Sequence, residues 1–196
     1  MREWQEMLND ATFDRRYHRR AMHSYPDHLV TAFQTADGRR VMLRPIRAAD
    51  AEIEQEFVRG LSDEARYYRF RDMLRELTPH MLKHLTEIDY CKHMAIIAVT
   101  EVNGRETEIG VARYVALPDG ESCEFAIVVG DAWQNKAIAT ALMQRLIEAA
   151  REYGLKRMVG DVMSSNDKML KFVAKLGFKI EPAADDPALM RASKDL

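Results

Sequence analysis

The stretch that decides the fold is Cys123–Thr140, CEFAIVVGDAWQNKAIAT, in which an apolar run passes through a short connection into the start of a helix. The first N–H groups of a helix have no partner inside the helix, and together with the helix dipole they favour an anion such as a phosphate. Ala137 and Ala139 are small, so a ligand could approach the backbone. A side-chain cap or water fills many such junctions, so the stretch indicates a candidate anion site and leaves its occupant open.

Short apolar strands are predicted ahead of this helix, because β-branched runs alternate with the turn pairs Asn103-Gly104 and Asp119-Gly120. Strands joined by tight turns pair antiparallel, so we expect a meander over Met94–Val99, Ile109–Leu117 and Cys123–Val129. The long helix is expected over Gln134–Tyr153, closed by Gly154. The elements expected beyond it are a strand over Lys156–Val162, a helix over Asn166–Leu176 ending at Gly177, and closing strands over Phe178–Ile180 and Ala188–Ala192.

The N-terminal half is predicted to begin with a hairpin and continue with helices. Asp37-Gly38 separates two strand-like runs, and Ser62 with Asp63, and Thr78 with Pro79, are typical helix starts. We expect strands over Leu29–Gln34 and Arg40–Arg44, and helices over Asp50–Leu61, from Ser62 through Arg71, and from Thr78 to Glu87. The whole order predicts an α/β (α+β) layered fold with one mixed sheet, as a single domain over residues 29–196 after a helical, basic extension over residues 1–28.

Composition excludes several classes of protein. The 196 residues include 47% hydrophobic and 31% charged residues, and the formal net charge is −2. No whole-molecule field therefore attracts nucleic acid or an anionic membrane, and no apolar run approaches the roughly 20 residues of a membrane helix. The N-terminus lacks the apolar segment of a secretory signal, so we expect a cytoplasmic protein without nucleic-acid or membrane partners.

Cysteine and histidine residues do not predict a metal centre. Cys91 and Cys123 form no CxxC pair and have no histidine partner in a known motif, so we expect both to be reduced, small, buried hydrophobes. His80 and His84 lie four residues apart on an expected helix. Two histidines without a third ligand do not make a zinc site, so a solvated helix face is the favoured interpretation and no metal is expected.

The pattern Gln134-x-x-Ala137-x-Ala139 after a strand, with Asn166 and Leu176-Gly177-Phe178 farther on, resembles the GNAT superfamily of N-acetyltransferases, whose motif is Gln/Arg-x-x-Gly-x-Gly/Ala. The likeness runs from about Val41 to Ile180 and is closer to the acetyltransferase domain of bacterial protein-lysine acetyltransferases. The residues that carry this closer likeness are Leu43-Arg44-Pro45-Ile46-Arg47, Leu61-Ser62, Arg66-Tyr67, Arg69-Phe70, Glu76-Leu77-Thr78, Ile88-Asp89-Tyr90, Gly110-Val111-Ala112-Arg113-Tyr114 and Glu124-Phe125-Ala126.

The resemblance implies a GNAT-type acyl-CoA N-acyltransferase fold, with a mixed central sheet that splays beside Ala126–Val129 at the coenzyme site. It implies acetyl-CoA as the acyl donor, with no metal. The pantetheine arm would pair with Ile127, Val128 and Val129, while Asn166 and Phe172 border the other side of the coenzyme. The pyrophosphate would be held at the strand-to-helix junction by Gln134, Asn135, Lys136, Ala137, Ile138, Ala139 and Thr140.

Two positions depart from the family pattern. Ala137 stands where the family has glycine, and its methyl group would point into the space of a pyrophosphate oxygen. Alanine stabilises a helix interior by about 1 kcal/mol over glycine, so drift toward stability without coenzyme binding would produce the same change. Val173 stands where many members have a tyrosine that protonates the leaving thiolate, so water or another donor would serve. A non-catalytic acyl-CoA sensor or regulatory domain is therefore an alternative.

Glu124 is the candidate catalytic residue, because it interrupts an apolar strand and shares one face with Ala126 and Val128. Desolvation raises the pKa of a buried carboxyl, and such a base could take a proton from a lysine ammonium. The family resemblance agrees with this role. The alternative is that Glu124 lies near a solvated strand end or pairs with an arginine such as Arg113.

The acceptor side is less marked in the sequence. Asp89 and Tyr90 match the family and could bind the incoming amine, although a turn with a buried aromatic residue explains them nearly as well. The stretch Arg66–Arg71 is expected to line the acceptor site, and the basic run Arg15–Arg20 to be solvated. The predicted reaction is acetyl transfer to an amine, with a protein lysine favoured, a small-molecule amine as an alternative, and the oligomeric state open.

Overall fold

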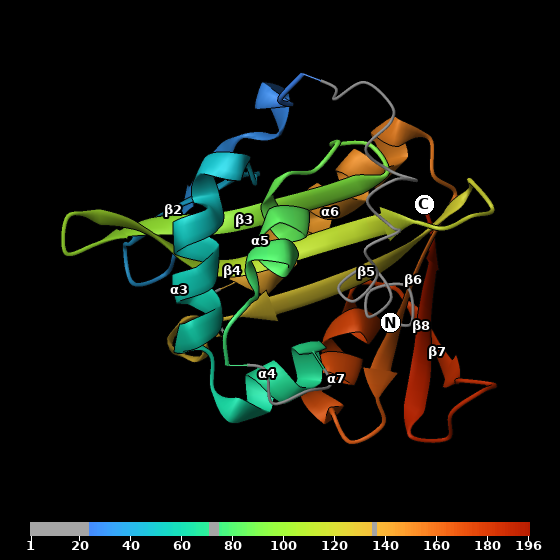
Figure 1. Ribbon diagram of the computed structural model, residues 1–196. Coiled ribbons are helices and arrows are strands. Elements are labelled where there is room, and N and C mark those ends of the chain that lie inside the picture. The colour runs from blue at the N-terminus through green and yellow to red at the C-terminus, as the bar shows by residue number, and fades with distance from the viewer. Residues whose placement is uncertain (1–23, 71–74, 135–136) are drawn as a thin grey trace.

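The computed structural model describes residues 24–70, 75–134 and 137–196. Within them the strands form one sheet in the order β1-β2-β3-β4-β5-β6-β8-β7 (Figure 1). Neighbouring strands are antiparallel except β5 and β6, which are parallel, so the mixed sheet is confirmed. The strands are β1 (Thr31–Gln34), β2 (Arg40–Pro45), β3 (His93–Val102), β4 (Arg105–Ala116), β5 (Ser122–Val129), β6 (Arg157–Met163), β7 (Lys179–Pro182) and β8 (Leu189–Asp195).

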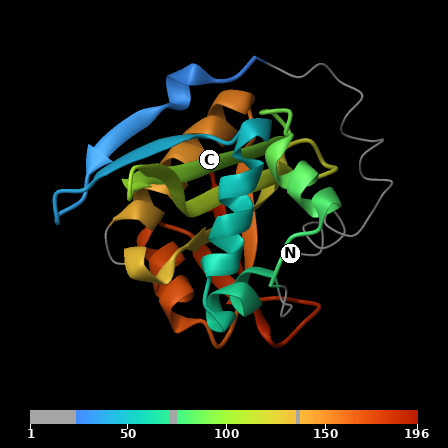
Figure 2. The ribbon, with the colours of Figure 1, turned by 60° about the vertical axis from the view of Figure 1, so that its left-hand side comes forward.

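Helices cover both faces of the sheet (Figures 1 and 2). One face, called the α3 face below, packs against α3 (Ala51–Gly60), α4 (Asp63–Phe70) and α5 (Pro79–Thr86). The other, called the α6 face, packs against α6 (Ile138–Tyr153) and α7 (Asp167–Lys175). The crossovers from β5 to β6 and from β6 to β7 run through α6 and α7, which pack on the same face. Short 3₁₀ turns, η1 (Asp27–Leu29), η2 (Ala48–Asp50) and η3 (Asp131–Trp133), join these elements.

The core lies in two layers because the central strands are buried on both sides. Every residue from His93 to Thr100 is buried, which explains why Met94–Val99 is an unbroken apolar run instead of alternating. Ile97 and Val111 face α3 and α5, while Ile96 and Ala112 face α6. The site described below therefore stands on a rigid central sheet.

Three local signals in the sequence are confirmed at helix ends. Ser62 caps α4, since its Oγ accepts the Ala65 N–H at 3.2 Å. Thr78 caps α5 in the same way, with Pro79 at the first helical position. Gly154 ends α6 in the left-handed conformation, at φ 94°.

Several predicted boundaries were wrong. The helix expected from Gln134 begins at Ile138, and Asp131–Trp133 forms a separate 3₁₀ turn. Leu29 belongs to η1, so β1 starts at Thr31. The closing strands extend to Pro182 and Asp195, because they pair with each other and with β6. The predictions for residues 1–23 of the extension, including Arg15–Arg20, and for Arg71, Asn135 and Lys136, fall outside the described residues.

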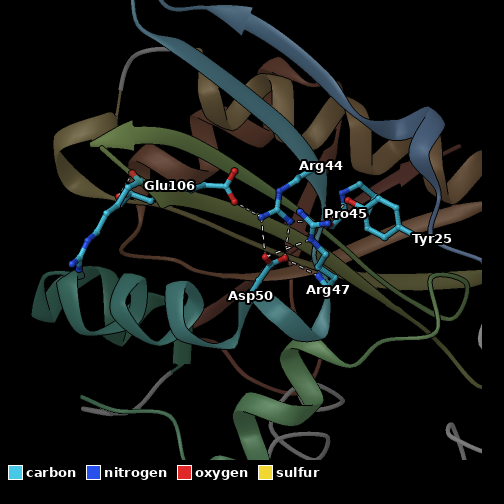
Figure 3. A network of polar contacts seen from close by, with 8 residues as sticks. Tyr25, Arg44, Pro45, Arg47, Asp50 and Glu106 are labelled. Carbon is cyan, nitrogen blue, oxygen red and sulfur yellow. Dashed lines mark hydrogen bonds and ion pairs between the residues drawn. The ribbon is translucent and has the colours of Figure 1, made fainter. Parts of the chain in front are cut away.

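A buried ion-pair network holds the start of α3 to the sheet. The guanidinium of Arg44 donates to both carboxylate oxygens of Asp50, at 2.6 and 2.8 Å, and to Glu106 of β4 at 2.6 Å (Figure 3). The Arg47 N–H also donates to Asp50, and the Tyr25 hydroxyl donates to the Pro45 carbonyl. Arg44 and Asp50 are buried, so their ion pair has little competition from water, and the exposed Glu106 extends the network to β4.

Candidate functional site

Strands β5 and β6 pair over only three residues and then part. Ser122–Glu124 lie beside Arg157–Val159, whereas β5 continues along β4 to Val129 and β6 continues along β8 to Met163. Phe125–Val129 therefore have a strand partner on the β4 side only, and the sheet is splayed where the sequence predicts it (Figure 1). Of the residues expected along the pantetheine, Ile127 and Val129 face α6, and Val128 faces α3.

The N-terminus of α6 follows the end of β5 directly. Ala137 is the N-cap residue, and no described side chain caps the helix. The Ala141 N–H donates to the Ala137 carbonyl at 3.0 Å, so the N–H groups of Ile138, Ala139 and Thr140 are those that a helix leaves without a helical partner. These main-chain donors can bind an anion.

Ala137 adopts the left-handed conformation, with φ 63° and ψ 0°. It does not lie inside the helix, so the comparison of alanine with glycine in a helix interior was wrong for this position. In the left-handed region the Cβ of alanine costs about 1–2 kcal/mol, which glycine avoids. A gain in helix stability therefore does not explain the alanine.

Gln134 lies in the connection between β5 and α6. Its side-chain amide donates to Asp131 Oδ1 at 3.2 Å, and Asp131 Oδ2 accepts the Ser62 N–H at 3.2 Å. The connection is thus hydrogen-bonded to the N-terminal end of α4.

The residues expected on the other side of the coenzyme lie on α7. Since β5 and β6 are parallel, the connections that lead into α6 and α7 leave the sheet at the same edge. Asn166 caps α7, with Oδ1 accepting the Met169 N–H at 3.1 Å, and Phe172 packs on the α6-face core. Val173 is fully buried in that core, so the position of the family tyrosine carries no hydroxyl and no solvent contact.

Glu124 occupies the last paired position before β5 and β6 part. It lies opposite Val115 and Val159 and is 5% exposed, so it is not at a solvated strand end. Arg113, the arginine expected as a possible partner, instead donates to Glu54 Oε1 at 2.7 Å and to the Leu85 carbonyl at 3.1 Å.

Asp89 and Tyr90 form the turn that precedes β3. Asp89 Oδ1 accepts the N–H groups of Cys91 and His93, both at 2.9 Å, and Tyr90 has a φ of 60°. The Tyr90 ring packs edge-on against Tyr25, and burial raises the pKa of its phenol. His93 lies in one row across the sheet with Val115 and Glu124, two strand spacings or about 10 Å from Glu124. The turn just before His93 is therefore at the same end of the sheet as Glu124.

A buried charged cluster beneath α3 was missed by sequence reasoning. Glu54, Glu108 and Arg113 are at most 3% exposed, and Arg69 of α4 is buried beside them. Burial, and then the charge of Glu54, raises the pKa of the Glu108 carboxyl well above its ordinary range. Burial, and then the like charge of Arg113, lowers the pKa of Arg69 to about 9. The available signal was the charge of Arg113 inside an apolar strand run.

The histidine and cysteine expectations need two corrections. His84 is buried, with its ring edge-on to His80, so the solvated-face prediction was wrong for His84. Cys123 is buried as expected, whereas Cys91 is only half-buried. Among the described residues no three histidine, cysteine or acidic side chains are grouped to hold a metal ion. In the same part of the chain, the helices are too short or too polar to span a membrane.

The splayed mixed sheet, with the uncapped start of a helix at its open edge, defines an acyltransferase architecture. The model of the acetyltransferase (GNAT) domain family matches residues 40–179. The chain belongs to the GNAT acetyltransferase family and is an acyltransferase. Related proteins include "Acetyltransferase PA5475" of Pseudomonas aeruginosa, 34% identical over 82% of this chain and 85% of that protein.

Two further relatives agree with the closer likeness. "Acetyltransferase Pat" of Mycolicibacterium smegmatis is 31% identical over 74% of this chain. The match covers 43% of that protein, so this chain spans less than half of it. The crystal structure of the GNAT domain of S. lividans PAT superposes with a TM-score of 0.80 at 28% identity, covering 88% of this chain and all of that domain.

Proposed function

We propose that this protein transfers the acetyl group of acetyl-CoA to a primary amine, with a protein lysine as the favoured acceptor and Glu124 as the general base. The observation that carries the proposal is the position of Glu124, a buried carboxyl at the point where β5 and β6 part. If acetyl-CoA lies along the open edge of β5, its thioester end reaches the position of Glu124.

The described residues fit acetyl-CoA as the donor. The backbone of Ile127–Val129 has a free edge for the amide groups of a pantetheine arm. The N–H groups of Ile138, Ala139 and Thr140 at the start of α6 suit a pyrophosphate, and Gln134 lies in the connection before them. Asn166 and Phe172 would border the coenzyme from α7.

The chemistry is direct transfer. Glu124 takes a proton from the acceptor ammonium, directly or through water, and the neutral amine then attacks the thioester carbonyl. A C–N bond forms and the C–S bond breaks, so the coenzyme leaves as a thiolate. The attacking nitrogen loses its second proton as the amide forms, and this proton reaches the thiolate through water or another donor, because Val173 has no hydroxyl.

The charge at this end of the sheet favours a cationic acceptor. Glu87 and Asp89 lie just before β3, and Glu124 lies in the row of residues that begins at His93. These carboxyl groups attract an ammonium group such as that of lysine. A coenzyme sensor and a small-molecule amine acetyltransferase are the outcomes that the experiment must separate from this proposal.

The first measurement is titration calorimetry of the protein with acetyl-CoA. We expect micromolar binding, equivalent to about −8 kcal/mol. Absence of heat and of thermal stabilisation at millimolar acetyl-CoA would contradict the proposal. Binding without release of free thiol would identify a sensor, and turnover with polyamines but not with folded proteins would identify a small-molecule enzyme.

The second measurement tests Glu124. We expect Glu124→Gln to lower turnover at least about 100-fold, because general base catalysis is lost, while acetyl-CoA binding is kept. The matched control is Glu121→Gln, since Glu121 is an exposed residue one position before β5 and should leave turnover unchanged. Full activity of Glu124→Gln would show that Glu124 is not the base.

A further inference from the structure

Phe125 lies over the strand that β5 leaves. It is the first residue of β5 beyond the pairing with β6, and its side chain is buried on the α6 face. A methyl group at Gly160 of β6 would lie 2.5 Å from the Cε1 atom of the Phe125 ring and 2.9 Å from Cδ1 and Cζ. The ring therefore rests directly on the Gly160 backbone, in space that only a glycine leaves free.

The Phe125 ring is supported from behind. Its centroid is 5.1 Å from that of Phe178, which precedes β7, and the two ring planes are inclined at 53°. This spacing is that of a favourable aromatic pair. The two rings therefore cover the α6 face of the sheet where β5 and β6 stop pairing.

An acyl group bound where β5 and β6 part can extend in three directions. Along the sheet it meets the paired backbones of Ser122–Glu124 and Arg157–Val159. Toward the α3 face it meets Glu124 and takes the place of the acceptor amine. Toward the α6 face it meets the Phe125 ring on Gly160.

We propose that Phe125, seated on Gly160, is a specificity-determining residue that restricts this enzyme to short acyl groups. The inference rests on the proposed function, in which the pantetheine arm follows Ile127–Val129 and brings the thioester beside Phe125. An acetyl group is short enough to end before the Phe125 ring. Each further methylene group of a longer acyl chain has to displace either this ring or the acceptor amine.

The test compares kcat/KM for acetyl-CoA and butyryl-CoA in the wild type, Phe125→Leu and Phe125→Ala. We expect the wild type to prefer acetyl-CoA, and both variants to shift the ratio toward butyryl-CoA by at least about tenfold. The conservative leucine variant keeps the test valid if the alanine variant fails to fold. The matched control is Phe33→Leu, because Phe33 of β1 packs on the same apolar core far from the open edge.

The outcomes separate the inference from the proposed function. An unchanged ratio in folded Phe125→Leu, an equal shift in Phe33→Leu, or equal use of both donors by the wild type would overturn the role of Phe125 while acetyl transfer stands. A wild type that binds acetyl-CoA and releases no thiol from any acyl-CoA would overturn the proposed function, and the inference with it.

Discussion

Ala137 and Glu124 each carry an energetic cost at the candidate site. Ala137 holds a left-handed backbone without being glycine, and Glu124 is a carboxyl buried in an apolar strand. Such costs persist where the surrounding structure over-determines them, and they gather at functional sites. Glu124 lies just before the open-edged segment Phe125–Val129 and Ala137 lies after it, and two such residues flanking one open strand segment favour an active site over a fold kept only for its stability.

At the residue scale we predict that Ala137→Gly raises the free energy of unfolding by about 1 kcal/mol. The change removes the Cβ from a left-handed residue, and the greater freedom of glycine in the unfolded chain offsets part of the gain. Urea denaturation measures the difference. The control is Ala141→Gly inside α6, where the same change should lower stability by about 1 kcal/mol. If both variants lose stability equally, the backbone at residue 137 is not left-handed.

At the scale of elements, β5 behaves as two segments. Ser122–Glu124 have strand partners on both sides, and Phe125–Val129 have one on the β4 side only. The change falls at Phe125, whose ring occupies the face of Gly160. The contact between these two residues therefore joins the two halves of the sheet where backbone pairing has stopped.

We predict that Gly160→Ala lowers the free energy of unfolding by about 1–3 kcal/mol, because the added methyl overlaps the Phe125 ring. Adding Phe125→Leu to Gly160→Ala should cost less than the sum of the two single changes. A double-mutant cycle in urea measures this coupling. Gly60→Ala is the control, since nothing lies within 4 Å of a methyl group at Gly60. Strict additivity would show that Gly160 does not accommodate the ring.

At the scale of the whole molecule, buried charges connect the helices to the sheet. Glu54 of α3 pairs with Arg113 of β4, and Glu108 and Arg69 lie within the same electrostatic cluster. Burying two carboxyl groups and two guanidinium groups away from water costs free energy unless the groups are paired or neutral. Burial and the charge of Glu54 raise the pKa of the Glu108 carboxyl, so among these groups its ionised form is the one that the cluster disfavours.

We predict that Glu108→Gln raises stability at neutral pH. The carboxyl has an ordinary pKa of 4.5 in the unfolded chain and a higher one in the folded protein, so the folded state binds more protons. The wild type therefore loses stability as the pH rises from 4.5 toward the folded pKa, and the glutamine variant lacks this loss. Urea denaturation of both proteins between pH 4 and about pH 8 should show a widening difference. A difference independent of pH would mean that Glu108 is ionised in the folded protein.

The amino-acid sequence by itself determined the order of strands and helices, the caps at Ser62, Thr78 and Gly154, and the position of the splay beside β5. The elements and the caps depend on hydrophobic periodicity and on residues within about four positions, so they can be read locally. The splay followed from the family motif. Asn166 could be named for the same reason, whereas Glu124 was named because a carboxyl interrupts an apolar strand run.

Only the tertiary structure decided how these residues are used. Arg113 pairs with Glu54, 59 positions away, and the Phe125 ring meets Gly160 across two strands joined through a helix. His84 is buried and Ala137 is left-handed because of the elements packed around them and the turn that enters α6. Such contacts depend on which faces meet in space, and a one-dimensional pattern of hydrophobicity and charge does not contain that information.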